Sequence, residues 1–236
     1  MGLGNFKVRL FIAITIVLVV WQSALKFWSL PNNDSELSKE VNEAAKNGAI
    51  EPEIQKVLVT VYYEALCPDS RSFLIKQLEP TYQSLNEHIT VEMVPYGKAI
   101  TTKKDDSYEF SCQHGPAECE ANMIHACAID IIKNPSVRLE FLVCMIKDNL
   151  NPIDITKSCG EKMNLDVASI LDCKENLKGK ELLAMYGKQT DDLRPKISFI
   201  PTITLDKNSD NQREILKNLL KEVCRLYKVP PKGCEL

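Results

Sequence analysis

One cysteine follows a strand-like stretch and could act as a nucleophile. Cys67 comes directly after residues 57–66, which are rich in β-branched and aromatic side chains, and precedes Pro68 and Asp69. The apolar residues that follow have helical spacing, so the pattern predicts a strand, a cysteine and a helix. A helix N-terminus carries partial positive charge and favours a thiolate, although the carboxylate of Asp69 opposes this effect. The pattern indicates thiol–disulfide chemistry at Cys67.

Ser70 stands where redox turns usually carry a second cysteine. In such a turn the first cysteine attacks a disulfide, and the second releases the mixed disulfide that forms. A serine can donate a hydrogen bond to the thiolate of Cys67, but it cannot form a disulfide. We therefore expect an outside thiol, cysteine or glutathione, or another thiol on the substrate, to resolve the mixed disulfide. Loss of activity, and an ordinary helical role for Ser70, stay open as alternatives.

The cysteine count and the N-terminus both indicate an oxidising lumen. The chain has 236 residues and nine cysteines, and residues 10–21 form an apolar run preceded by Lys7 and Arg9, as in a secretory signal. In such a compartment paired cysteines form disulfides, which leaves one of the nine over. We expect Cys67 to be the unpaired cysteine, and we assign the others to disulfides: Cys112, Cys119, Cys127, Cys144, Cys159, Cys173, Cys224 and Cys234.

The chain divides into three parts. Residues 1–28 are a signal peptide or an uncleaved signal-anchor, because the cleavage site is unclear and the apolar run is short for a span of about 20 residues. Residues 29–55 are polar and form a flexible lumenal stalk, where Asn33 begins a glycosylation sequon. Residues 56–236 form the folded domain. The chain contacts a membrane only in the signal-anchor case.

Charge and spacing argue against two kinds of partner. Beyond residue 28 the chain carries 26 basic and 32 acidic residues, and this acidic body disfavours nucleic acid as a partner. The spacing of Cys112, Cys119 and Cys127, near His114 and His125, fits no standard zinc pattern. We expect no metal there, and structural roles for the histidines.

The order of the predicted elements indicates an α/β fold. The expected elements are a strand at 56–65, a helix to about residue 86 that Pro80 kinks or splits, a strand at 88–95, a polar loop at 97–108, helices at 121–133, 137–148 and 179–189, a weaker helix at 166–173, a strand at 197–206 broken by a proline, and a helix at 212–227. This order matches a thioredoxin-like sheet with a cysteine-rich helical insert at about 109–178. In that fold a cis proline lies beside the redox turn, and Pro201 is the candidate.

The segment Cys-Gln-His-Gly-x-x-Glu-Cys-x-x-Asn-x-x-x-x-Cys at 112–127 resembles the signature of the gamma-interferon-inducible lysosomal thiol reductase family. The resemblance extends over about residues 56–234, including segments 62–67, 94–97, 143–145 and 223–227. It implies a thioredoxin-like fold and an enzyme that reduces protein disulfides in endosomes and lysosomes, with a role in antigen processing or host defence. The family's first active-site cysteine falls on Cys67, and its second falls on Ser70.

These observations predict a thiol–disulfide oxidoreductase of the secretory pathway, lysosomal or secreted, that acts on disulfide-bonded proteins. No bound cofactor is expected, and the reductant is an external small thiol. The alternative is a binding or chaperone-like module on the same fold, in which Cys67 no longer reacts. Cys224 and Cys234 are expected to pair, because the Pro-Pro tail allows the chain to fold back, whereas the six cysteines of the insert allow 15 pairings.

Overall fold

The computed structural model describes residue 21 and residues 56–235. Ile54–Leu236 form one compact unit. The expectations for the signal, for the stalk and for Asn33 lie outside the described residues, apart from Trp21. Among the helices of the described part of the chain, none is long and apolar enough to cross a membrane.

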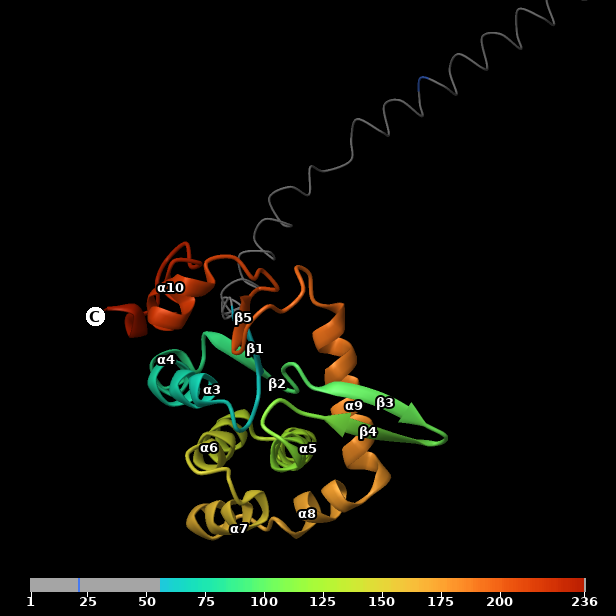
Figure 1. Cartoon of the computed structure of the whole chain (residues 1–236). Coiled ribbons are helices and arrows are strands. Elements are labelled where there is room, and N and C mark those ends of the chain that lie inside the picture. Colours follow the sequence, from blue (N-terminus) through green and yellow to red (C-terminus); the bar gives the residue numbers. More distant parts are fainter. Residues whose placement is uncertain (1–20, 22–55, 236) are drawn as a thin grey trace, which may run out of the picture. The chain divides into compact units, whose positions relative to one another are not determined.

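A three-stranded sheet lies at the centre of the domain (Figure 1). The strands are β1 (Val57–Tyr63), β2 (Ile89–Pro95) and β5 (Thr202–Leu205), in the order β2-β1-β5. The central strand β1 runs parallel to β2 and antiparallel to β5. Most of its side chains are buried, which explains why its sequence is continuously apolar rather than alternating. The sheet edge β5 is shorter than expected, because the strand begins only after Pro201.

The helical segment after Cys67 changes from an α-helix to a π-helix before Pro80. It consists of α3 (Pro68–Phe73), the π-helix η1 (Leu74–Leu78) and α4 (Glu79–Leu85). Proline lacks the backbone N–H that an α-helix requires, and its ring would collide with the preceding turn. The wider π turn directly before Pro80 accommodates both effects. The predicted interruption therefore occurs as a change of helix type.

Along the chain, a hairpin and five helices follow β2 and precede β5 (Figure 1). The helices are α5 (Pro116–Ile131), α6 (Pro135–Ile146), α7 (Pro152–Met163), α8 (Ala168–Glu175) and α9 (Leu177–Asp192). The first three begin with proline, which needs no hydrogen-bond partner at that position. Both α5 and α9 contact β2 and cover part of the sheet. The helical insertion of the α/β fold is thus confirmed.

Disulfides fasten this insert internally. Cys127 on α5 is bonded to Cys173 on α8, and Cys144 on α6 is bonded to Cys159 on α7. A third bond, between Cys112 and Cys119, closes the loop that leads into α5. The last joins Cys224 of helix α11 (Leu219–Cys224) to Cys234 in the short 3-10 helix η2 (Lys232–Cys234).

Three sequence expectations were wrong. The polar segment 97–108 is no loop, because β3 (Ile100–Lys104) and β4 (Ser107–Ser111) form an antiparallel hairpin within it and beyond it. Helix α7 was not predicted at all. The single helix expected at 212–227 is two helices, α10 (Gln212–Lys217) and α11, separated by Asn218 in a non-helical conformation.

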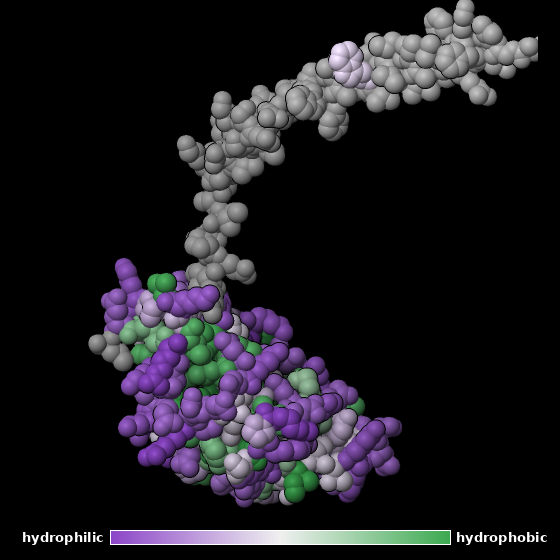
Figure 2. Space-filling view, turned by 90° about the horizontal axis from the view of Figure 1, so that it is seen from above, coloured by the Kyte–Doolittle hydropathy of each residue, from purple (hydrophilic) through white to green (hydrophobic). Residues whose placement is uncertain are grey.

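The surface of the domain is mainly hydrophilic on the face seen from above, with hydrophobic side chains gathered in a limited area (Figure 2). Among the described residues, the large apolar side chains that solvent reaches include Leu150, Met185, Phe199 and Val229. Phe199 is the one that lies next to the Cys67 turn, as described below.

Candidate active site

Cys67 sits where β1 passes into α3. It is the N-cap residue of α3, its N–H donates to the carbonyl oxygen of Glu64 at 3.3 Å, and its carbonyl accepts from Arg71 N–H at 3.0 Å. The side chain is 8% exposed, and its sulfur lies 4.0 Å from the carbonyl oxygen of Ile200. The peptide bond between Ile200 and Pro201 is cis. The fold therefore brings Cys67 and the Ile200–Pro201 segment together from distant parts of the chain.

Ser70 is fully buried and faces the backbone rather than the thiol. Its hydroxyl oxygen accepts a hydrogen bond from the N–H of Glu64 at 3.3 Å. Within the described part of the chain, no hydrogen bond joins Ser70 to the sulfur of Cys67. The expected hydrogen bond to the thiol is thus not made in this structure. Through this hydrogen bond to Glu64, Ser70 instead links the start of α3 to the end of β1.

Two asparagines hold Ala65, in the middle of the turn. The N–H of Ala65 donates to Asn122 Oδ1 at 2.9 Å, and Asn149 Nδ2 donates to the carbonyl of Ala65 at 3.4 Å. Asn149 Nδ2 also lies 3.1 Å from Nε2 of His125, whose Nδ1 lies 2.8 Å from the hydroxyl of Tyr63. Burial lowers the pKa of His125 to about 3, so the imidazole is neutral. It serves as a structural link beneath the turn.

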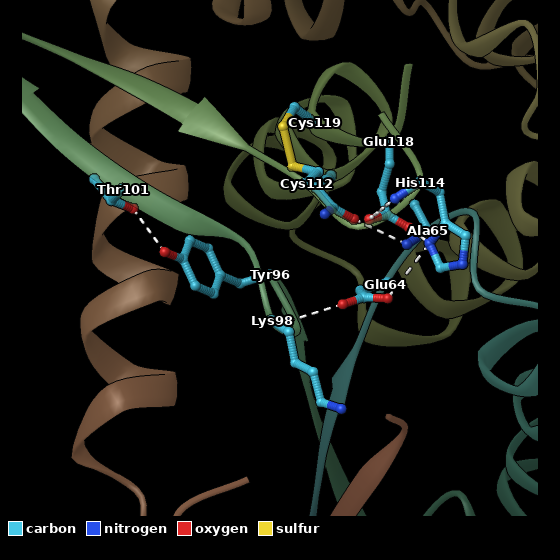
Figure 3. Close-up of a disulfide and its surroundings, with 10 residues drawn as sticks. Glu64, Ala65, Tyr96, Lys98, Thr101, Cys112, His114, Glu118 and Cys119 are labelled. Atoms are coloured by element: carbon cyan, nitrogen blue, oxygen red, sulfur yellow. Dashed lines mark hydrogen bonds and ion pairs between the residues drawn. A yellow bond between two sulfur atoms is a disulfide. The ribbon is translucent and has the colours of Figure 1, made fainter. Parts of the chain in front are cut away.

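A second cluster lies on the other side of β1's end, where Glu64, His114 and Glu118 point toward one another (Figure 3). Nδ1 of His114 is 2.5 Å from Oε2 of Glu118 and 3.5 Å from Oε2 of Glu64. Both carboxylates are 1% exposed, whereas the imidazole is 40% exposed. Burial raises the pKa of Glu64, and the negative charge of Glu118 adds to this effect. The N–H of Lys98, which donates to Glu64 Oε1 at 2.8 Å, opposes it.

Among the described residues, these three side chains are the group that could hold a metal ion, because their potential ligand atoms all lie within 4.8 Å of one another. Two ligands of a tetrahedral zinc ion, each about 2.0–2.1 Å from the metal, would be about 3.3 Å apart. The 2.5 Å between His114 and Glu118 is instead a hydrogen-bond distance. The geometry fits a hydrogen bond between the two side chains better than a shared cation. The cysteines near the histidines are bonded to other cysteines, so they are not free to bind metal.

A groove of about 310 Å³ opens beside the Cys67 turn. Asp69 and Lys76 line it from the helical side, and Phe199 and Pro201 line it from the opposite side. Phe199 is 38% exposed. The groove thus combines charged groups with an accessible apolar surface next to the Cys67 turn, as a site for a peptide requires.

Cys67 is the free cysteine of the structure, and the eight others form the four disulfides. The residues that support the turn were not identified from the sequence. A signal existed for Glu118 and Asn122, which lie inside the 112–127 signature, and for Glu64, which lies in the run before Cys67. No comparable signal marks Asn149, because it reaches the turn only through the packing of the insert.

Comparisons with known proteins identify the family of the chain. Residues 58–163 match the family model of gamma interferon inducible lysosomal thiol reductase (GILT). A gamma-interferon-inducible lysosomal thiol reductase-like protein of Anopheles gambiae is 31% identical over 76% of this chain and 80% of its own length. The gamma-interferon-inducible lysosomal thiol reductase of Mus musculus is also 31% identical, over 75% of this chain and 70% of its own length.

Among solved structures, the crystal structure of Chlamydia trachomatis DsbA superposes with a TM-score of 0.53. The match covers 74% of this chain and 90% of that protein, at 11% sequence identity. At this identity the likeness concerns the fold, and it confirms the thioredoxin-like class with a helical insertion.

Proposed function

The chain belongs to the gamma interferon inducible lysosomal thiol reductase family and is a thiol–disulfide oxidoreductase; from this premise we propose that Cys67 alone carries its reaction. The observation that supports this is the state of the cysteines. Cys67 is free beside a groove, and each other cysteine is already bonded. Ser70, at the position of a resolving cysteine, is buried and bonded to Glu64. A second thiol therefore has to come from outside the protein.

The reaction proceeds in three exchanges. The thiolate of Cys67 attacks one sulfur of a substrate disulfide, a new S–S bond forms, and the other substrate sulfur leaves and takes up a proton. A small thiol, cysteine or glutathione, then attacks the sulfur of Cys67 and releases the second substrate thiol. A second small thiol attacks the small-molecule sulfur now bound to Cys67 and frees it. Two small thiols are oxidised to one disulfide, and the substrate disulfide is reduced to two thiols.

The groove beside Cys67 binds the substrate. Its apolar wall, formed by Phe199, Ile200 and Pro201, packs against the segment that carries the disulfide. Asp69 and Lys76 on the opposite wall supply charged contacts. Substrates are therefore proteins whose disulfide lies in an accessible, partly apolar segment. Pro201 shapes this wall and is a site residue in that sense.

The compartment is the lumen of the secretory pathway, either in endosomes and lysosomes or outside the cell. Four disulfides in one domain support an oxidising lumen, and the matched relatives carry "lysosomal" in their names. The N-terminal signal or signal-anchor and the glycosylation of Asn33 belong to this proposal, as does a role in host defence.

Three proteins test the single-thiol reaction: wild type, Cys67→Ala and Ser70→Cys. Each is assayed at acid pH for reduction of a disulfide-bonded protein, with free cysteine or glutathione as the reductant. We expect turnover in the wild type that depends on the small thiol and is absent in Cys67→Ala. Ser84→Ala is the matched control, because Ser84 is exposed on α4 and does not line the groove.

Each result decides between the functions. Equal activity of Cys67→Ala and wild type would overturn the reaction through this sulfur. Activity found only in Ser70→Cys would make the natural protein a binding module that retains disulfide-bonded proteins without reducing them.

A further inference from the structure

Glu64 holds the Cys67 turn through its backbone. Its carbonyl accepts from the N–H of Cys67, and its own N–H donates to the buried hydroxyl of Ser70, both at 3.3 Å. The first bond closes a four-residue turn from Glu64 to Cys67, so the two Cα atoms are within about 7 Å. The position of the thiol relative to β1 therefore depends directly on Glu64.

The side chain of Glu64 ties the same residue to a separate part of the fold. Oε1 accepts from the N–H of Lys98, in the loop after β2. Oε2 faces the imidazole of His114, which is bonded to Glu118 at the start of α5 (Figure 3). Space around this side chain is tight, because a Cβ atom on Gly97 would lie 2.2 Å from Glu64 Cγ. The carboxyl group cannot move without disturbing this packing.

The charge of the cluster is not balanced when every carboxyl is ionised. Three titratable groups face Glu64: Lys98 from the loop after β2, His114 from the loop before α5, and Glu118 from α5 itself. The Lys98 side chain points away from the Glu64 carboxyl (Figure 3). The imidazole is the positive group within the cluster, the charge of Lys98 lowers the pKa of Glu64 more weakly, and Oε2 of Glu64 has no hydrogen-bond partner. A buried, unpaired carboxylate is costly, and a proton removes that cost.

We propose that Glu64 is a positioning residue for Cys67 whose buried carboxyl is neutral in acid and places a negative charge next to the thiol turn at higher pH. In an acidic lumen Glu64 then places no negative charge near Cys67. As the pH rises, Glu64 ionises and this negative charge appears. The inference rests on the proposed function only in taking Cys67 as the reacting thiol.

The test is the rate at which iodoacetamide alkylates Cys67, compared between Glu64→Gln and wild type at each pH. Glutamine has the size of glutamate and remains neutral, so it imitates the protonated side chain. We expect equal rates near about pH 4. Toward about pH 8 the variant becomes faster by roughly threefold to tenfold, because a nearby carboxylate disfavours the thiolate only in the wild type. A purely structural role of Glu64 changes the rate by the same factor at every pH.

Glu222→Gln is the matched control, since Glu222 is another buried glutamate, which lies on α11 and is paired with Arg225 directly after that helix. The ratio of its alkylation rate to that of wild type is expected to stay constant over the same pH range. If Glu64→Gln unfolds, judged by its melting curve, His114→Gln replaces it, because this half-exposed side chain tolerates substitution. Loss of its positive charge favours the neutral form of Glu64, so the inflection in the alkylation profile moves to higher pH.

A rate ratio for Glu64→Gln that does not vary with pH, or an inflection that His114→Gln leaves in place, would overturn the proposal. Alkylation needs no turnover, so this result is separate from the proposed function. That function fails instead when Cys67→Ala still reduces substrate.

Discussion

The N–H of Glu64 donates to the hydroxyl oxygen of Ser70 at 3.3 Å, across the turn that carries Cys67. Both groups are buried, so neither can exchange this bond for one with water. The serine at the position of a second redox cysteine therefore has a structural task of its own. It keeps the first turn of α3 attached to the end of β1, and the free thiol lies between these two points.

Replacement of Ser70 by alanine leaves the Glu64 N–H without a partner in a buried place. We expect the free energy of unfolding of Ser70→Ala to fall by about 1–2 kcal/mol, the usual cost of an unsatisfied buried donor. Urea unfolding monitored by circular dichroism measures the difference. Ser72→Ala, at an exposed position of the same helix, should change it by less than about 0.5 kcal/mol. Equal losses in the two variants would mean that the Ser70 bond contributes nothing.

His125 makes the folded protein sensitive to acid. Its pKa is about 3 in the folded state, against 6.5 for an unperturbed histidine, so the unfolded chain binds the extra proton first as the pH falls. The stability that neutral His125 contributes is therefore complete above about pH 6.5 and is lost progressively toward pH 3. Between pH 7 and pH 5 this amounts to about 2 kcal/mol.

The variant His125→Gln isolates this effect. Glutamine does not titrate, so the variant should lose about 2 kcal/mol less than the wild type between pH 7 and pH 5 in urea unfolding. Any stability that the variant loses through poorer packing cancels in that difference, because this loss is the same at both pH values. Parallel pH curves for the two proteins would show that His125 takes up no proton on unfolding.

The strand–cysteine–helix order around Cys67 could be predicted because local patterns specify it. β1 is apolar on both faces, and Pro68 stands at the first helical position. The break at Asn218 also had a local signal, since its side chain accepts from the N–H of Lys221 as an N-cap does. Helix α7 had Pro152 at its start and Asn164 in a left-handed conformation at its end. These end signals were available, and the low average hydrophobicity of the residues between them concealed the helix.

Other features depend on tertiary contacts that no local pattern contains. The hairpin of β3 and β4 has a largely exposed surface, so it lacks the apolar alternation by which strands are found. The cluster of Glu64, His114 and Glu118 joins residues 50 positions apart, and a buried glutamate looks like an exposed one in the sequence. The signature at 112–127 pointed to the family, but the role of its polar residues beneath the turn came only from the structure.

Phe199 should matter for protein substrates and not for small ones. This residue is 38% exposed on the wall of the groove beside the Cys67 turn, so a bound segment would cover it. We expect Phe199→Ser to lower kcat/KM for a disulfide-bonded protein by roughly tenfold, the effect of about 60 Å² of lost apolar contact. The rate with a small aromatic disulfide should stay close to wild type. Met185→Ser is the control, because Met185 is exposed beside a different cavity.

Gly97 and Gly115 form a matched pair that separates backbone strain from contact with Glu64. Both have positive φ, +62° and +84°, so alanine at either position costs about 1–3 kcal/mol in backbone strain, and the ψ of −171° at Gly115 places that residue in a region that essentially only glycine adopts. A Cβ atom at Gly97 would also lie 2.2 Å from Glu64 Cγ, whereas nothing lies within 4 Å of one at Gly115. Both variants should therefore lose stability in urea unfolding, but only Gly97→Ala should alter the alkylation rate of Cys67. Unchanged alkylation in both variants would show that the Cys67 turn does not depend on the packing of Glu64.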